Sequence, residues 1–372
     1  NPSAAVVAVG CYVQAAGAEL KKDEAVDLIV GNNQKKDLVQ ILDDYFADHE
    51  NSGEILDIGH SQEYEGLHIR RIADHTRAFI KVQDGCNQFC SYCIIPYTRG
   101  RVRSRRPEEV VAEVRELAAA GYQEVVLTGI HLSSYGMEKG NDFTKSRLGE
   151  LIRAVNAVEG VRRIRLGSLE PRIITEEFAK ELSQCEKLCP HFHLSLQSGC
   201  DSVLQRMNRK YTTGEYYEKV EILRKFFDKP AITTDVIVGF PQETEEEFTQ
   251  TVEFLKKIRF YETHIFKYSK RKGTPAAIMQ GQIPEEVKSV RSDRLSELHT
   301  QNSHAFRESY IGKQVEYLLE EEMVIDGVRY QTGYTREYIR IALKTQEDLS
   351  GTIQKGVIRE FLKPDILLVF SS

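Results

Sequence analysis

Three cysteines that could bind a metal cluster lie within eight residues, at Cys86, Cys90 and Cys93. Clusters of the [4Fe–4S] type are normally held by four thiolates, so a compact set of three leaves one iron open to an outside ligand. A zinc knuckle or a group of buried thiols is the alternative. Structural zinc, however, closes its tetrahedron with a further Cys or His at short spacing, and none follows Cys93 before His131. The spacing therefore predicts an iron–sulfur cluster with one reactive iron.

The order C-x3-C-x2-C, with an aromatic residue before the last cysteine, resembles the signature of the radical S-adenosylmethionine superfamily. The resemblance implies that the open iron is chelated by the amino and carboxylate groups of S-adenosylmethionine. It also implies that one-electron reduction of the cluster cleaves the sulfonium and releases a 5'-deoxyadenosyl radical. Tyr92 is then expected to lie beside the adenine.

Alternating strands and helices must position these cysteines. Short apolar runs predict six strands, at residues 78–82, 124–128, 163–167, 191–196, 232–238 and 263–268. Helices separate most of them, and the clearest one begins at Pro107, which suits a first helical turn, and is stopped by Gly121. Six such units fall short of the eight of a closed (β/α)8 barrel. The pattern predicts an α/β fold built on a partial (β/α)6 barrel.

Ligand-binding groups are expected at the carboxyl ends of these strands, and the cysteine set follows the first of them. S-adenosylmethionine needs donors for its carboxylate, acceptors for its ammonium and ribose, and glycine where the backbone approaches closely. The residues that follow the second to fifth strands supply such groups. The predicted contacts to this cofactor are Thr128, Gly129, Ser168, Glu170, Gln197, Arg209 and Val238. Arg209 is a candidate for the carboxylate or for an RNA phosphate.

The two ends of the chain predict smaller domains. Apolar runs at residues 4–10 and 27–31, with a helix at about 35–48, predict the last part of a parallel α/β domain that presents Cys11 as a candidate metal ligand. A polar connector is expected at about 49–75. Five short strands are expected at 314–319, 329–334, 338–342, 351–358 and 366–370. They predict a small β-barrel that binds RNA, with a structural cap as the alternative.

The positive charges are unevenly distributed. A formal net charge of −6 argues against general nucleic-acid binding, but distribution matters more than the sum. A run of arginines directly follows the cysteines, and a second basic block surrounds Tyr268, for which a solvated surface loop is the alternative. Tyrosines and arginines also alternate in the expected C-terminal barrel. The predicted RNA-binding residues are Arg99, Arg101, Arg103, Arg105, Lys270, Arg271, Tyr334 and Arg336.

The length and composition of the sequence limit the number of domains and the expected cellular location. The 372 residues allow two or three domains. Because no apolar run approaches about 18 residues and no secretory leader opens the sequence, we expect a cytoplasmic protein with no membrane partner. Seven cysteines suit a reducing compartment, and Cys185, Cys189 and Cys200 are expected to be buried core residues. The sequence begins at Asn1 inside what reads as a fold, so we expect a preceding N-terminal segment.

Longer segments resemble the methylthiotransferase family of radical S-adenosylmethionine enzymes. They are residues 9–12, 85–100, 103–105, 196–199, 239–241 and 268–276. The resemblance implies a flavodoxin-like N-terminal domain, of which residues 1–60 are the last part, a partial barrel at 61–310 and a TRAM β-domain at 311–372. It also implies a second [4Fe–4S] cluster, held by three cysteines of the N-terminal domain, of which Cys11 matches the third.

The resemblance also implies a substrate. Residues 127–131 are most similar to the family members that convert N6-threonylcarbamoyladenosine at position 37 of tRNA into its 2-methylthio derivative. The implied partners are the tRNA anticodon stem-loop and a flavodoxin-like or ferredoxin-like electron donor. Sister enzymes act on isopentenyladenosine or on a ribosomal-protein aspartate, and both acceptors stay open. A non-catalytic RNA-binding iron–sulfur protein is the alternative from a different class.

Overall fold

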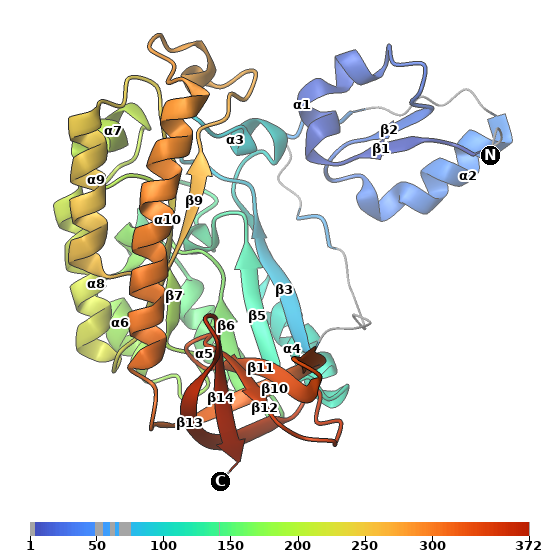
Figure 1. Cartoon of the computed structure of the whole chain (residues 1–372). Coiled ribbons are helices and arrows are strands. Elements are labelled where there is room, and N and C mark those ends of the chain that lie inside the picture. The colour runs from blue at the N-terminus through green and yellow to red at the C-terminus, as the bar shows by residue number, and fades with distance from the viewer. Residues whose placement is uncertain (1–3, 49–54, 60–63, 67–75, 141, 372) are drawn as a thin grey trace.

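The computed structural model describes residues 4–48, 55–59, 64–66, 76–140 and 142–371. A small α/β unit, a large curved sheet flanked by helices, and a closed β-barrel follow one another along the chain (Figure 1). None of the helices in these ranges combines the length and the apolarity that a membrane crossing requires.

The N-terminal unit has the elements that its apolar runs predict. Strand β1 (Val7–Val9) pairs in parallel with β2 (Leu28–Val30), and α1 (Cys11–Leu20) connects them. A short 3-10 turn, η1 (Lys35–Asp37), leads into α2 (Leu38–Asp48). The connector expected at residues 49–75 lies mostly outside the described residues, and so does the domain boundary expected after residue 60. That boundary stays a prediction.

Six parallel strands form the curved central sheet. They are β3 (Arg77–Asp84), β5 (Glu124–Gly129), β6 (Arg163–Leu166), β7 (His191–His193), β8 (Ala231–Val238) and β9 (Glu262–Lys267). Strands β3, β5 and β6 pair in that order, as do β7, β8 and β9, and two isolated parallel bridges join the halves. The short β4 (Arg103–Ser104) pairs antiparallel with β3. The predicted partial (β/α)6 barrel is therefore confirmed.

One strand is shorter than predicted. The regular ladder of β7 ends at His193. The apolar pattern continues to Leu196, and the amides of Leu194 and Gln197 still donate to the carbonyls of Thr233 and Asp235. The amide of Leu196 donates to the Thr234 hydroxyl (3.0 Å) instead of to a backbone carbonyl. Gln197 then takes a left-handed conformation, with φ of 75°. The pairing becomes irregular at this point because the Thr234 side chain takes over a hydrogen bond that a backbone ladder would otherwise make.

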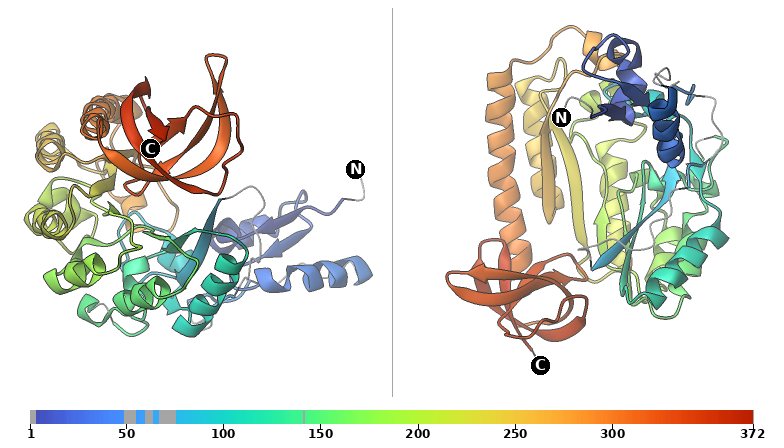
Figure 2. Two further views of the ribbon diagram at one scale, coloured as in Figure 1. Left: turned by 90° about the horizontal axis from the view of Figure 1, so that it is seen from below. Right: turned by 90° about the vertical axis from the view of Figure 1, so that its right-hand side faces the viewer.

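Helices cover the outer face of the sheet, as the view from below shows (Figure 2). The longer ones are α4 (Pro107–Ala119), α5 (Leu148–Asn156), α6 (Glu176–Ser183), α8 (Thr213–Phe226), α9 (Glu245–Ile258) and α10 (Glu285–Glu308). The short ones are α3 (Ile95–Thr98), α7 (Asp201–Arg206), η2 (Leu132–Ser134), η3 (Phe143–Lys145), η4 (Pro171–Ile173) and η5 (Pro275–Ile278). Helices α8 and α9 begin with complete capping boxes, which satisfy their first backbone amides. Proline in the first turn starts α4, as predicted.

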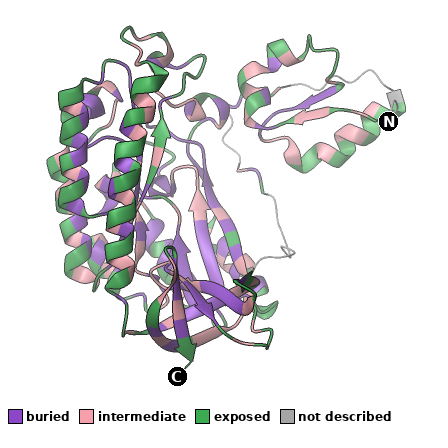
Figure 3. Ribbon diagram, in the orientation of Figure 1, coloured by how far each residue is buried: buried purple, intermediate pink, exposed green. Residues whose placement is uncertain are grey.

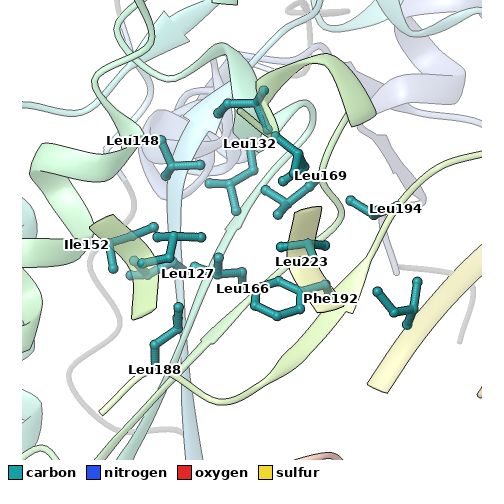
Figure 4. Close-up of a cluster of buried hydrophobic side chains, with 14 of the residues drawn as sticks. Leu127, Leu132, Leu148, Ile152, Leu166, Leu169, Leu188, Phe192, Leu194 and Leu223 are labelled. Atoms are coloured by element: carbon teal, nitrogen blue, oxygen red, sulfur yellow. The ribbon is translucent and has the colours of Figure 1, made fainter. Parts of the chain in front are cut away.

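The main core lies between this sheet and its helices. Leu127, Leu166 and Phe192 project from β5, β6 and β7 against Ile152 and Leu223 of the helices (Figure 4). Strands β5, β6 and β8 are largely buried, whereas β9 and the outer helices carry many exposed residues (Figure 3). Full burial of such side chains stabilises a fold by about 1.5–3 kcal/mol each. The core therefore fixes the strand ends that carry the site.

The C-terminal barrel is closed, in the order β10-β11-β12-β14-β13. Its strands are β10 (Gln314–Ile325), β11 (Val328–Thr335), β12 (Arg340–Leu343), β13 (Ile353–Lys363) and β14 (Ile366–Ser371). Closure removes exposed sheet edges, which allows so short a chain to form a stable barrel. The predicted five-stranded barrel is confirmed, with a core that includes Tyr317, Ile341 and Leu367.

This barrel docks on the amino-terminal ends of the central strands. Arg77, at the start of β3, hydrogen-bonds the Tyr338 hydroxyl (2.9 Å) and pairs with Glu320 (2.7 Å). Arg163, at the start of β6, pairs with Glu316 (3.0 Å). The cysteines follow the opposite, carboxyl end of β3, next to α3 (Figure 1). The two ends of the central barrel therefore have different roles, docking at one and the candidate site at the other.

Candidate active site

The cysteine loop, residues 85–94, begins where β3 ends. Gly85 has φ of 73°, and a Cβ at this position would lie 1.8 Å from the carbonyl oxygen of Arg101. The amide of Cys86 donates to the carbonyl of Gly100 (3.0 Å). Only glycine fits this conformation and this close approach. The loop is therefore pinned against the chain that follows α3, and its cysteines are held at the strand end.

The three thiols fit a cluster better than a single metal ion. Cys86 and Cys90 are buried and Cys93 is half-buried. Their sulfur atoms do not all lie within 4.8 Å of one another. Two sulfurs on one zinc ion stand at most about 4.6 Å apart, because each Zn–S bond is about 2.3 Å. The wider spacing argues against the zinc knuckle and suits a larger iron–sulfur cluster.

Burial controls the charge state of these thiols. It raises the pKa of Cys86 to about 12, and it also raises the pKa of Cys93. The amide of Gln88 faces the Cys86 sulfur at 3.5 Å, and Arg209 Nη1 donates to the Cys90 sulfur at 3.3 Å. Both donors favour thiolate, but burial outweighs them for Cys86. A bound cationic cluster is what would hold all the sulfurs as thiolates in such a buried site.

Arg209 is placed beside the cluster loop, as the sequence suggested, but its contacts are with protein groups. It also donates to the Tyr211 hydroxyl (2.9 Å) and to the carbonyl of Ser195 (3.2 Å). Burial raises the pKa of Tyr92, the aromatic residue of the loop, well above its usual value. The Arg209 guanidinium is held by these hydrogen bonds and supplies a fixed positive charge next to Cys90. Its predicted contact with the carboxylate of S-adenosylmethionine stays a prediction.

The end of β5 carries two predicted cofactor residues, Thr128 and Gly129. A Cβ on Gly129 would lie 2.8 Å from Gln83 Oε1, so the glycine makes room for that buried side chain. Gln83 in turn accepts a hydrogen bond from the His131 amide (2.7 Å). The His131 ring bonds Ser134 Oγ (2.7 Å), as expected of a hydrogen-bonding histidine at a strand end. Burial lowers its pKa to about 3, so the ring is neutral.

The end of β6 is connected to the cysteine loop. Glu170 is buried and pairs with Arg172 (2.6 Å), which donates to Gln88 Oε1 (2.7 Å) inside the loop. Ser168, two residues earlier, is exposed. Glu170 is therefore partly engaged in holding the loop, whereas the Ser168 hydroxyl remains accessible. Both stay predicted contacts of S-adenosylmethionine.

A pocket of about 310 Å³ lies beside the cysteine loop at the ends of β8 and β9. Tyr92 and Gln197, two predicted cofactor residues, line it together with residues that the sequence did not single out for this role. The further lining residues are Asp235, Ile237, Phe266, Lys267, Tyr268, Ser269 and Arg271. Val238, also predicted, is fully buried in the core instead. The pocket is large enough for a nucleoside-sized group.

Cys11 lies at the start of α1, next to the same region. The buried Asn32 side chain donates through Nδ2 to the carbonyl of Thr98 in α3 (2.6 Å) and faces the Cys11 sulfur at 3.5 Å. Lys272 pairs with Glu19 of α1. These contacts place Cys11 near the segment that follows the cysteine loop. Asn32, which the sequence analysis missed, connects Cys11 with Thr98 of α3.

The arginine run does not form a continuous RNA-binding surface. Arg103 is 2% exposed and pairs with Asp84 (3.6 Å), and Arg105 is 6% exposed and pairs with Glu113. The prediction that these two bind RNA is wrong, because pairing of β4 with β3 turns both side chains into the protein. Arg99 is half-buried and lies 3.8 Å from Asp84. Arg101 is exposed and covers the Phe89 ring at 4.9 Å.

The prediction that Tyr334 and Arg336 bind RNA stays a prediction, but both half-buried side chains contact protein groups. The Tyr334 ring stacks on Tyr338 at 4.4 Å. The Arg336 guanidinium donates to the carbonyls of Glu186 (2.6 Å) and Leu188 (2.7 Å). The Arg77 guanidinium also lies 5.2 Å from the centre of the Tyr334 ring, so both residues contact the central barrel at the end away from the cysteines. Lys270 and Arg271, in contrast, are exposed in the loop after β9.

Asp84 is a second residue that the sequence analysis missed. Its carboxylate accepts from the Gly85 amide (2.9 Å) and lies against Lys81 (2.7 Å), Arg99 and Arg103. Burial alone would raise the pKa of Asp84, but Lys81 and the neighbouring groups hold it below its usual value. A carboxylate at the end of a strand is common in sequences. Its position directly before the Gly85-Cys86 turn was the only available signal.

We expect Asp84→Asn to lower the free energy of unfolding by about 3 kcal/mol at pH 7, because it leaves buried Arg103 without its counter-charge. Since the folded-state pKa of Asp84 is depressed, its contribution is complete above the unfolded pKa of about 3.9 and is lost as pH falls through the folded value. Urea unfolding at pH 7 and in a series below pH 4 measures both effects. Asp326→Asn, in an exposed pair with Lys363, should change stability by less than about 0.5 kcal/mol. Equal effects of the two variants would contradict the role of Asp84.

Comparison with known proteins agrees with this geometry. The Radical SAM superfamily model matches residues 80–255. The threonylcarbamoyladenosine tRNA methylthiotransferase MtaB of Bacillus subtilis is 40% identical over 356 residues, which are 95% of this chain and 78% of that protein. The Aquifex aeolicus protein of the same name is 43% identical, over 87% of this chain and 77% of its own. The tRNA-2-methylthio-N(6)-dimethylallyladenosine synthase of Carboxydothermus hydrogenoformans is 37% identical, over 97% of this chain and 81% of its own.

The fold and the cysteine site define a radical S-adenosylmethionine enzyme, whose cofactors are a [4Fe–4S] cluster and S-adenosylmethionine. Given such identity over most of each relative, the chain belongs to the radical S-adenosylmethionine methylthiotransferase family. Among solved structures, the radical S-adenosylmethionine methyltransferase TsrM from Kitasatospora setae has a TM-score of 0.46 and 20% identity, over 54% of this chain and 38% of that chain. That likeness is too low to support an argument about the site.

Proposed function

We propose that this enzyme adds a methylthio group to C2 of N6-threonylcarbamoyladenosine at position 37 of tRNA. Family membership supports the transferred group, and the relatives' names support tRNA as the acceptor. When bound, the cluster and S-adenosylmethionine supply the radical that activates the adenine C2–H bond. Cys86, Cys90 and Cys93 would hold that cluster, and Cys11 would be one ligand of the auxiliary cluster.

The charged residues that line the 310 Å³ pocket are the observation that favours threonylcarbamoyladenosine over isopentenyladenosine as the acceptor. A threonylcarbamoyl group ends in a carboxylate, whereas a dimethylallyl group is an uncharged hydrocarbon. Lys267, Arg271 and Asp235 all line the pocket. The Lys267 ammonium pairs with Glu285 (3.2 Å), so Arg271 is the cation that the carboxylate would meet, and hydrogen bonds between charged partners are the stronger ones. The exposed Phe266 ring on the same wall offers a surface on which a base can stack. An exposed arginine beside an aromatic wall therefore favours the threonylcarbamoylated base.

The loop that carries Arg271 is fixed to the cysteine loop. The amide of Ala276 donates to the carbonyl of Ser91 (2.8 Å), and the Thr274 hydroxyl donates to the carbonyl of Arg271 (2.7 Å). The backbone of this loop is thereby tied to the cysteine loop, and Arg271 and Tyr92 line the same pocket. This arrangement supports a base bound between the basic residues and the radical source, with little freedom to move away.

The remaining assignments belong to the same proposal. Thr128, Gly129, Ser168, Glu170, Gln197 and Arg209 would contact S-adenosylmethionine, and Val238 would act from the core behind the pocket. The anticodon stem-loop would be the part of tRNA that docks, and a flavodoxin-like or ferredoxin-like protein would deliver the electron. The exposed Arg101, Lys270 and Arg271 are the basic residues best placed to meet RNA phosphates near the cysteine loop.

Mass spectrometry of nucleosides tests the substrate. Reconstituted protein, S-adenosylmethionine and reductant are incubated separately with tRNA carrying threonylcarbamoyladenosine and with tRNA carrying isopentenyladenosine. We expect a methylthio derivative from the first tRNA only. Ile237 and Phe266 give the pocket apolar walls that would also suit the second acceptor, so product from that tRNA alone would replace the substrate assignment. Absence of S-adenosylmethionine cleavage would instead support a non-catalytic RNA-binding protein.

Arg101→Ala is expected to weaken tRNA binding and to lower the slope of log affinity against log salt by about one unit, as loss of one phosphate contact does. Binding titrations at several salt concentrations measure this slope. Arg106→Ala is the matched control, because Arg106 is similarly exposed but pairs with Glu109. An unchanged slope for Arg101→Ala, or an equal change for Arg106→Ala, would exclude a phosphate contact at Arg101.

A further inference from the structure

A second group of metal-binding side chains lies inside the central barrel, apart from the cysteines. One ligand atom from each of His193, Asp235 and His264 lies within 4.8 Å of the other two. Across residues 4–48, 55–59, 64–66, 76–140 and 142–371, this is the one group of three such side chains that meets this distance. The three residues belong to adjacent strands, β7, β8 and β9, and are far apart in the sequence.

Strand register brings these side chains together. His193 is opposite Thr233, and Asp235 is opposite His264, in the two parallel ladders. Neighbouring residues Phe192 and Val236 are fully buried in the core beneath the helices. Because successive side chains of a strand point to opposite faces, His193 and Asp235 face the inside of the barrel. Three strands thus present nitrogen and oxygen ligands on one inner surface.

The orientation of His193 suits a metal ligand. Its Nδ1 bonds the Thr233 hydroxyl (3.0 Å), which leaves Nε2 directed at Asp235 Oδ2, 3.2 Å away. That nitrogen is buried, and within the described structure it has no partner in hydrogen-bond geometry. The His193 and His264 rings are nearly parallel, with centroids 5.7 Å apart. Metal-binding histidines characteristically use their second nitrogen in this way, because the hydrogen bond fixes the ring.

We propose that His193, Asp235 and His264 bind one divalent transition-metal ion, of the class that includes Fe²⁺, Zn²⁺ and Mn²⁺. Two imidazoles and one carboxylate are a ligand set that such ions accept and that leaves coordination positions open. A plain His–Asp ion pair would account for His193 and Asp235. It does not account for a second imidazole from a third strand, stacked on the first.

The site adjoins the pocket beside the cysteine loop, since Asp235 lines both. An ion held here has its open positions on the pocket side, where an oxygen of a bound nucleoside can reach it. A carboxylate, such as that of the threonylcarbamoyl group, is a suitable oxygen ligand for these ions. The contact between this ion and the threonylcarbamoyl carboxylate rests on the proposed function, whereas the metal site itself does not.

Equilibrium dialysis against Co²⁺ tests the site, with visible absorption as a second readout. Cluster-loaded protein is used after gel filtration, so that the cysteines are occupied. We expect one Co²⁺ per chain. The difference spectrum against cobalt-free, cluster-loaded protein should show ligand-field bands and no thiolate-to-cobalt charge-transfer band. His264→Ala and Asp235→Asn should each weaken Co²⁺ binding at least tenfold. His264 is exposed, so its replacement should leave the fold intact. His304→Ala removes another exposed histidine, which stacks on Phe361, and should bind Co²⁺ as the unmodified protein does.

Absence of saturable Co²⁺ binding would overturn the proposal, as would equal affinity of His264→Ala and the unmodified protein. A thiolate-to-cobalt charge-transfer band in the difference spectrum would also overturn it, because the ion would then be on cysteine. Cleavage of S-adenosylmethionine, measured on the same samples without tRNA, reports on the cysteine site alone. Absent Co²⁺ binding with retained cleavage and retained methylthiolation of threonylcarbamoyladenosine in tRNA therefore marks a failure at this site alone. Bound Co²⁺ without that methylthiolation marks a failure of the proposed function alone.

Discussion

The Cys93→Ala variant is expected to lose reductive cleavage of S-adenosylmethionine, with 5'-deoxyadenosine formation falling at least about a thousandfold, or about 4 kcal/mol in barrier. Three thiolates are the minimum that holds a four-iron cluster with one open iron. Within the described site, Gln88 N–H and the Arg209 guanidinium face Cys86 and Cys90, and both are donors that cannot replace a thiolate ligand. Product formation with dithionite as reductant, followed by chromatography, measures the loss.

Cys185→Ala provides the matched control. Cys185 is 5% exposed, and its thiol donates to the carbonyl of Glu181 (3.7 Å) in the helix-facing core. We expect iron content and cleavage close to those of the unmodified protein, because this thiol is remote from the cysteine loop. Cleavage retained by Cys93→Ala would rule out the site, and an equal loss in both variants would indicate a general effect of losing a buried thiol.

Arg271→Ala is expected to lower kcat/KM for tRNA carrying threonylcarbamoyladenosine by about 10-fold to 100-fold. A hydrogen bond to a charged group contributes about 1.5–3 kcal/mol, and each 1.36 kcal/mol changes a rate by a factor of ten. Arg271 is exposed and lines the pocket, so its removal should leave the fold unchanged. Cleavage of S-adenosylmethionine without tRNA should stay the same. Single-turnover methylthiolation at varied tRNA concentrations measures the effect.

Lys270→Ala separates a pocket contact from a general loss of charge. Lys270 is exposed and adjacent in sequence, but the described pocket is lined by Arg271 and not by Lys270. We expect kcat/KM for Lys270→Ala to change less than about threefold, which corresponds to well under 1 kcal/mol. Equal effects in the two variants would mean that Arg271, like Lys270, meets only RNA phosphates and does not contact the carboxylate of the modified base. A larger effect on isopentenyladenosine-containing tRNA would argue against its contact with a carboxylate.

The pattern of apolar residues within each segment predicted most of the strands of the fold. Each predicted strand of the central sheet and of the C-terminal barrel has an observed counterpart, because an apolar run needs only its own residues to be recognised. The error at β7 arose from Thr234, a residue on another strand that captures the amide of Leu196. No local pattern contains that contact. Strand ends are for this reason harder to predict than strand existence.

The residues of the candidate site also fall into two groups, those that local sequence predicts and those whose role depends on the tertiary structure. Cys86, Cys90 and Cys93 are close in sequence, so their spacing alone predicted a cluster loop. In contrast, Arg101 and Arg103 read alike in the sequence, yet one is exposed and the other is 2% exposed beside Asp84. Their difference depends on how β4 pairs with β3. The prediction of RNA binding failed for Arg103 because charge patterns do not show burial.

The sequence by itself determined the cysteine loop, the order of the strands and the family, since each rests on residues that are neighbours in the chain. Only the tertiary structure decided which charges are free, that Arg336 fastens the C-terminal barrel to the far end of the central one, and that His193, Asp235 and His264 meet. The physical reason is that these contacts join strands separated by many residues. Their formation depends on sheet register and on packing, and neither is a property of any one segment.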